Sequence, residues 1–105
     1  MAIMTPITAD LVAATPTDLV PAGVPIGEDW SFSVTFTNRV AAPTTVRLAV
    51  SATGTPGDDE WRLFDFPLPA NGVVENTQRL APQGYHVVVQ AADAGVSVAI
   101  DGYVG

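Results

Sequence analysis

Apolar and polar residues alternate strictly between Trp30 and Asn38, where the chain reads Trp-Ser-Phe-Ser-Val-Thr-Phe-Thr-Asn. Because successive side chains on a β-strand point to opposite faces, the aromatic and valine side chains share one face and the hydroxyls share the other. Such alternation is typical of an antiparallel strand with one face in a core and the other turned toward water. The residues expected to be buried together are Phe32, Val34, Phe36, Val46, Leu48 and Val98.

Turn residues interrupt the rest of the chain at short intervals, and Asn71-Gly72 is the strongest turn signal among them. No segment shows helical periodicity, and no linker or repeat divides the chain. This spacing predicts an all-β protein, an antiparallel β-sandwich of seven or eight short strands, either Ig-like or jelly-roll-like. The strand candidates span residues 7–14, 18–20, 30–38, 44–51, 61–66, 73–80, 85–91 and 96–104.

The expected domain organisation is a single sandwich over residues 10–105, preceded by an N-terminal arm over residues 1–9. The arm contains Pro6 and no helical pattern, so it is expected to gain order only against a partner. A signal peptide is not expected, since the N-terminus lacks a basic start and a long apolar stretch. No apolar run approaches the ~20 residues that a membrane helix needs. The chain is therefore expected to be made in the cytoplasm as a soluble protein.

The charge balance of the 105 residues narrows the classes of partner. Eleven acidic residues stand against four arginines, and the net charge is −7. This charge argues against a nucleic-acid partner, because phosphate binding needs clustered cations, and it favours a basic protein neighbour. Only 14% of the residues are charged, which is consistent with a surface partly covered by other subunits. The absence of cysteine excludes disulfides, thiolate metal sites and cysteine nucleophiles.

The acidic triplet Asp58-Asp59-Glu60 lies in the most polar stretch of the chain, which is expected to be a mobile loop. Carboxylates are calcium ligands, but the spacing differs from that of a calcium-binding loop. A solvated loop, in which Arg62 pairs with one of the acids, is the preferred interpretation. We therefore expect neither a metal ion nor another cofactor.

Catalytic residues are not expected. His86 is the only histidine, no neighbour in sequence is suited to orient it, and a surface or interface position is predicted. The Gly-x-Ser-x-Gly motif of serine hydrolases is missing. Paired carboxylates need only meet in space, but a sandwich of this size leaves little room for a catalytic cleft. The chain is predicted not to be an enzyme.

Two aromatic residues stand out as binding candidates. Trp61 directly follows the acidic loop, and Tyr103 lies near the C-terminal end of the last expected strand. Either could anchor a protein interface or stack on a sugar, while Trp61 could instead cap one end of the sandwich. The residues expected to contact a partner are Asp58, Asp59, Glu60, Trp61, Arg62 and Tyr103.

The order of the turn and strand motifs resembles that of small β-sandwich structural proteins of tailed bacteriophages. The resemblance covers about residues 11–104 and departs from that pattern in the acidic insert and the absence of lysine. It implies a non-enzymatic virion component present in many copies, such as a decoration, neck or collar, tail or fibre-anchoring protein. The motifs that carry it are Val20-Pro21-Ala22-Gly23, Thr37-Asn38, Pro67-Leu68-Pro69-Ala70, Val73-Val74-Glu75-Asn76, Leu80-Ala81-Pro82-Gln83-Gly84-Tyr85 and Asp101-Gly102-Tyr103.

The implied partners are other virion structural proteins or further copies of the chain, and the implied location is the virion. A sandwich edge that pairs with another chain would suit such assembly. A carbohydrate-binding or host-recognition module is the alternative, with a host glycan bound through Trp61 and Tyr103. Neither a nucleic acid nor a membrane is expected as a partner.

Overall fold

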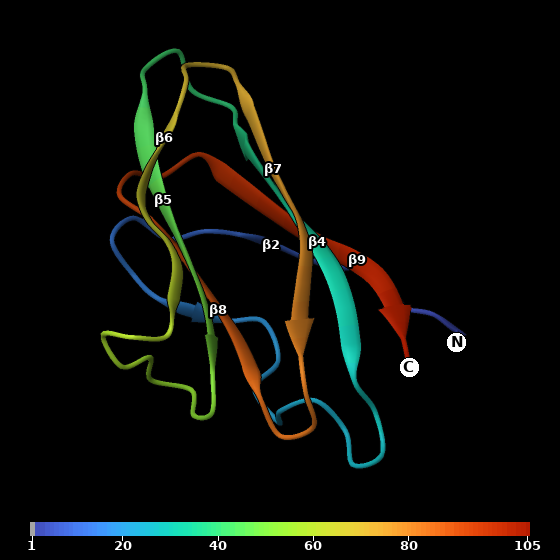
Figure 1. Cartoon of the computed structure of the whole chain (residues 1–105). Helices are drawn as coiled ribbons and strands as arrows, with labels where there is room; N and C mark the ends of the chain where they lie inside the picture. Colours follow the sequence, from blue (N-terminus) through green and yellow to red (C-terminus); the bar gives the residue numbers. More distant parts are fainter. Residues whose placement is uncertain (1) are drawn as a thin grey trace.

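The computed structural model describes residues 2–105, which form nine β-strands and no helix (Figure 1). The predicted all-β class and antiparallel sandwich are confirmed. The structure adds a short first strand that the sequence pattern did not predict. The strands are β1 (Ala2–Ile3), β2 (Ile7–Asp10), β3 (Thr17–Asp18), β4 (Trp30–Asn38), β5 (Thr44–Ser51), β6 (Trp61–Leu68), β7 (Val73–Ala81), β8 (His86–Ala91) and β9 (Val96–Val104).

The strands form two sheets whose pairings are nested. In the first sheet β9 and β4 are central, with β1 and β2 pairing β9 on one side and β7 pairing β4 on the other. The second sheet has the order β3-β8-β5-β6. The antiparallel pairs β5·β6, β4·β7, β3·β8 and β2·β9 therefore enclose one another along the chain, like one long hairpin rolled into two layers. This nesting is the jelly-roll arrangement, so the structure decides between the two sandwich types that the sequence left open.

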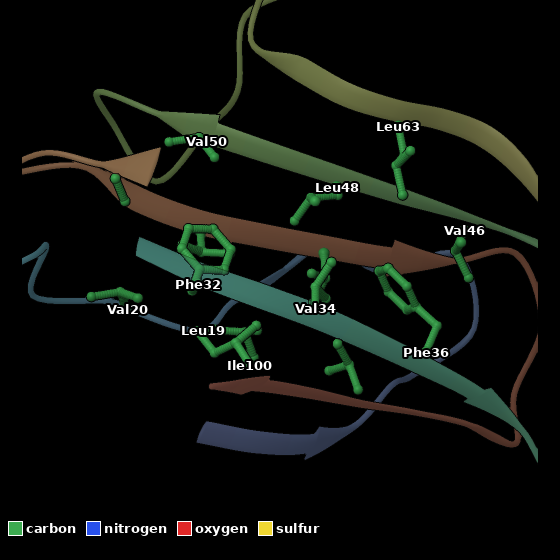
Figure 2. Close-up of a cluster of buried hydrophobic side chains, with 14 of the residues drawn as sticks. Leu19, Val20, Phe32, Val34, Phe36, Val46, Leu48, Val50, Leu63 and Ile100 are labelled. Atoms are coloured by element: carbon green, nitrogen blue, oxygen red, sulfur yellow. The ribbon is translucent and has the colours of Figure 1, made fainter. Parts of the chain in front are cut away.

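The core lies between the two sheets, and the six residues predicted to share it are all buried (Figure 2). The three from β4 point toward the second sheet, and Val98 of β9 is the register partner of Phe36. Ser31, Ser33, Thr35 and Thr37, which alternate with the core residues of β4, lie on the outer face and are partly exposed. The inside–outside assignment made from the alternation is therefore confirmed.

The first residues of the chain belong to the first sheet rather than to a free arm. Ala2 and Ile3 pair with the end of β9, and residues 7–10 pair with its middle. Between them Met4 is buried in the core, and its N–H donates to the carbonyl of Gly102 over 2.9 Å. The exposed edge of β9 supplies the hydrogen-bond partners that a short segment cannot find alone. Residues 2–9 therefore have their order without a partner, contrary to the expectation; Met1 lies outside the described residues.

The edges formed by β6 and β7 are poorly suited to pairing with another chain. On one side the edges are β6 and β7. Strand β6 carries Pro67 and shifts its register twice against β5, with Asp65 at a φ of 51°. Strand β7 shifts once against β4, with Gln78 at a φ of 60°. Bulges and proline on an edge oppose strand addition, so pairing with another chain is not favoured along β6 and β7.

Candidate partner-binding site

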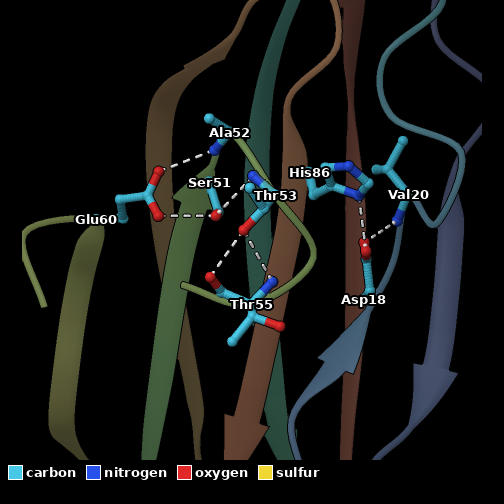
Figure 3. Close-up of polar contacts among 8 residues, drawn as sticks. All are labelled: Asp18, Val20, Ser51, Ala52, Thr53, Thr55, Glu60 and His86. Carbon is cyan, nitrogen blue, oxygen red and sulfur yellow. Dashed lines mark hydrogen bonds and ion pairs between the residues drawn. The ribbon is translucent and has the colours of Figure 1, made fainter. Parts of the chain in front are cut away.

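The Glu60 side chain accepts hydrogen bonds from several residues of the acidic loop between β5 and β6. Its carboxylate accepts the N–H of Gly57 over 2.9 Å, the N–H of Ala52 over 2.8 Å and the hydroxyl of Ser51 over 2.8 Å (Figure 3). These donors, with the backbone of Gly57 first, lower the pKa of the Glu60 carboxyl below its ordinary value of 4.5. Glu60 therefore holds the loop in place through three hydrogen bonds.

The other charged residues of the loop behave differently. Asp58 and Asp59 are exposed. Arg62 donates to the backbone carbonyl of Glu60 over 3.1 Å, and not to a carboxylate as expected. Within residues 2–105, no three histidine or acidic side chains gather closely enough to hold a metal ion. Both carboxylate oxygens of Glu60 accept hydrogen bonds from within the loop and from β5.

His86 has a partner that the sequence did not reveal. Its Nδ1 lies 2.7 Å from Oδ2 of Asp18, 68 residues away along the chain, and the two side chains are only 16% and 21% exposed. On the other side of His86, Ser51 is its register partner on β5. A polar row of Asp18, His86, Ser51 and Glu60 thus crosses the second sheet (Figure 3). Because Ser51 is fully buried and donates to Glu60, the row links three strands, β3, β8 and β5, to the acidic loop.

An aromatic cluster lies next to this row on the outer face of the second sheet. The Arg47 guanidinium carbon lies 3.9 Å from the ring centre of Phe64 and 5.9 Å from that of Trp61. The two rings meet edge to face, with centres 5.8 Å apart and an angle of 71°. Arg47 also donates to both carboxylate oxygens of Asp65, over 2.7 and 3.2 Å. We call Arg47, Trp61, Phe64 and Asp65 the aromatic–arginine patch.

The bulge in β6 creates this patch. Leu48 pairs with Leu63 and Val46 pairs with Phe66, so Arg47 alone lies opposite two residues, Phe64 and Asp65. Simple alternation would put those two on opposite faces, but the bulge turns both outward. Asp65 lies in this bulge at a φ of 51°, and hydrogen bonds from Arg47 lower the pKa of its carboxyl below its usual range. Sequence reasoning missed Arg47 and Phe64 because a single-strand pattern does not reveal a bulge.

The geometry of the patch favours a protein partner over a sugar. Phe64 is 58% exposed, whereas Trp61 is half-buried. Arg47 already covers one face of the Phe64 ring, and Trp61 meets the same ring edge-on. A stacked sugar needs a broad open ring face, whereas a protein anchor needs a fixed, protruding apolar side chain beside a cation. Trp61 supports Phe64 rather than acting as an open platform.

Tyr103 lies apart from the acidic loop, on the outer face of the first sheet. It projects on the same face as Leu80 of β7, because both residues pair with Ser31 of β4. An open groove of about 460 Å³ runs between them. The six residues expected to form one contact surface are therefore divided between two sheets: the loop and Trp61 on the second, Tyr103 on the first.

Comparisons with known proteins add no functional assignment. Neither a protein-family model, nor a curated protein, nor a solved structure matches this chain. In the part of the chain that the structure describes, no helix is long and apolar enough to cross a membrane. The case for a function therefore depends on the geometry of the two outer faces.

Proposed function

We propose that this chain is a non-enzymatic structural component of a tailed-bacteriophage particle, present in many copies and acting through protein–protein contacts. The resemblance of its turn and strand motifs supports this role. The jelly roll is an architecture that viral capsid domains use, although lectin domains use it as well. Its low content of charged residues suits a surface that neighbouring subunits cover.

The observation that carries the proposal is the aromatic–arginine patch. Phe64 is held outward by the bulge and by the guanidinium of Arg47, so little side-chain freedom is left to lose on binding. Aromatic residues and arginine are the anchors found most often at the centres of protein interfaces. Asp65 holds Arg47 in place from the other side. The patch thus presents a fixed aromatic side chain beside a paired arginine, and little ordering is needed when a partner binds.

The test compares Phe64→Ser with Ile26→Ser, a matched loss of an exposed apolar side chain in a distant turn. The wild-type chain should form a defined oligomer in sedimentation experiments or appear in purified phage particles by mass spectrometry. Phe64→Ser should retain the wild-type melting temperature but weaken assembly by about 2 kcal/mol, or roughly 30-fold. Ile26→Ser should assemble like wild type.

Two results would contradict the proposal. A strictly monomeric chain that is missing from purified particles would remove the assembly role. Binding to a glycan array that Trp61→Ala abolishes would instead establish the carbohydrate-binding alternative.

A further inference from the structure

A row of exposed apolar side chains crosses the outer face of the first sheet, on the opposite side of the molecule from the aromatic–arginine patch. Register pairs Ile3 with Tyr103, Tyr103 with Ser31, and Ser31 with Leu80, so these four residues lie side by side across β1, β9, β4 and β7. Ile3 is 82% exposed, Leu80 70% and Tyr103 51%. We call Ile3, Tyr103 and Leu80 the apolar row.

The small side chain of Ser31 makes a groove in the middle of this row. Leu80 and Tyr103 stand on either side of it, and Trp30 lies at the same end of β4. The groove has a volume of about 460 Å³, within the ~300–1,000 Å³ typical of binding pockets. A volume of this size can hold a large apolar side chain of a partner between Leu80 and Tyr103.

Within residues 2–105, the charged side chains placed at the groove or on its face of β9 are acidic. Asp29 is the one charged side chain among the residues that line it. Asp101 precedes Tyr103 by two residues and therefore points to the same face of β9. Glu28 lies nearby and accepts the indole N–H of Trp30 over 3.1 Å. Arg79, although next to Leu80, belongs to the other face of β7 and donates to Asn76.

This charge distribution identifies the kind of partner. A second copy seated on the same face would bring its own carboxylates against these, and like charges across an interface are unfavourable. A segment with lysine or arginine beside its apolar side chain would instead meet opposite charge. The chain's net charge of −7 extends the same preference to longer range.

We propose that the groove between Leu80 and Tyr103 binds a protein segment that presents a large apolar side chain flanked by lysine or arginine. This surface goes beyond the proposed function, because it lies on the other sheet and needs no contact by the aromatic–arginine patch. With both surfaces occupied, the domain would connect two different neighbours across its thickness.

The probe is an amidated peptide with two lysines on each side of one phenylalanine, titrated into the isotope-labelled chain and followed by amide NMR shifts. Saturable shifts should cluster at Ser31, Leu80 and Tyr103, and added salt should weaken binding. Leu80→Ser and Tyr103→Ser should each weaken binding at least tenfold. Two control variants should bind the peptide like wild type. Val73→Ser removes an exposed apolar side chain at the other end of β7, and Phe64→Ser removes one from the opposite sheet.

Several outcomes would overturn the inference. One is an equal response to a peptide with glutamates in place of the lysines, or with alanine in place of the phenylalanine. Another is binding that survives both Leu80→Ser and Tyr103→Ser in variants whose melts show that they are folded. If a serine variant does not fold, Leu80→Ala is tested in its place and should also weaken peptide binding at least tenfold. Concentration-dependent dimerisation that Leu80→Ser abolishes would assign the groove to a second copy instead.

Discussion

Replacing Phe36 with alanine tests the inside–outside assignment on which the fold description depends. Phe36 is fully buried between the two sheets. Its register partners in the first sheet are Val74 on β7 and Val98 on β9, and Val46 of the second sheet lies near its ring (Figure 2). The substitution removes the whole ring from a space closed by strands on both sides.

The expected cost follows from this enclosure. Truncation of a buried phenylalanine to alanine costs ~3–5 kcal/mol, and sites that cannot collapse lie at the upper end. Two hydrogen-bonded sheets resist closing around the cavity, so we expect about 4 kcal/mol here. For a domain of this size, that lowers the melting temperature by roughly 15–30 °C. Since total stabilities are ~5–15 kcal/mol, a large share of the folding free energy would be lost.

The assay is thermal and urea unfolding of Phe36→Ala beside Phe64→Ala, which makes the same chemical change on an exposed side chain. The Phe64 variant should lose less than about 1 kcal/mol, since exposed positions contribute little. If Phe36→Ala does not fold at all, Phe36→Leu gives a graded loss at the same position. A Phe36→Ala melt equal to that of wild type, or a larger loss for Phe64→Ala, would refute the register assigned to β4.

Two further predictions concern the N-terminus and the acidic loop. Met4→Ala should lower the free energy of unfolding by about 2 kcal/mol, because Met4 is buried in the core; a melt equal to that of wild type would mean that residues 2–5 are not packed in solution. Glu60→Gln should be less stable than wild type at neutral pH, and the difference should shrink as the pH falls below 4.5. The reason is that a carboxyl with a lowered folded-state pKa stabilises the fold above its unfolded value and loses that contribution as the pH falls through its folded value. Parallel melts from pH 3 to 8 measure this difference, and a constant gap between the two proteins would contradict it.

The sequence alone determined the class of the fold and which side chains of β4 enter the core. Alternation along residues 30–38 is local information, since a strand's two faces follow from backbone geometry and need no knowledge of the neighbouring strands. Burial of Phe32, Val34 and Phe36 could be read directly from it. Turn residues likewise marked most strand boundaries, because glycine and proline act on the backbone of their own segment.

The sites depended on contacts between distant segments, which no local pattern contains. His86 contacts Asp18, which lies 68 residues away along the chain. Arg47 contacts Asp65 because a bulge shifts the register of β6 against β5 by one residue. The grouping of Tyr103 with Leu80 required the order of strands in the first sheet.

Local sequence patterns also did not determine that the sandwich is a jelly roll rather than Ig-like. The same holds for the docking of residues 2–10 on β9. Both depend on which strands share hydrogen bonds, and every exposed strand edge offers much the same donors and acceptors. Side-chain alternation reports which face of a strand is buried, but it says nothing about which strand lies beside it. Only the packing of the whole chain determines which strands lie side by side. The strand order in turn determines which side chains meet on the two outer surfaces.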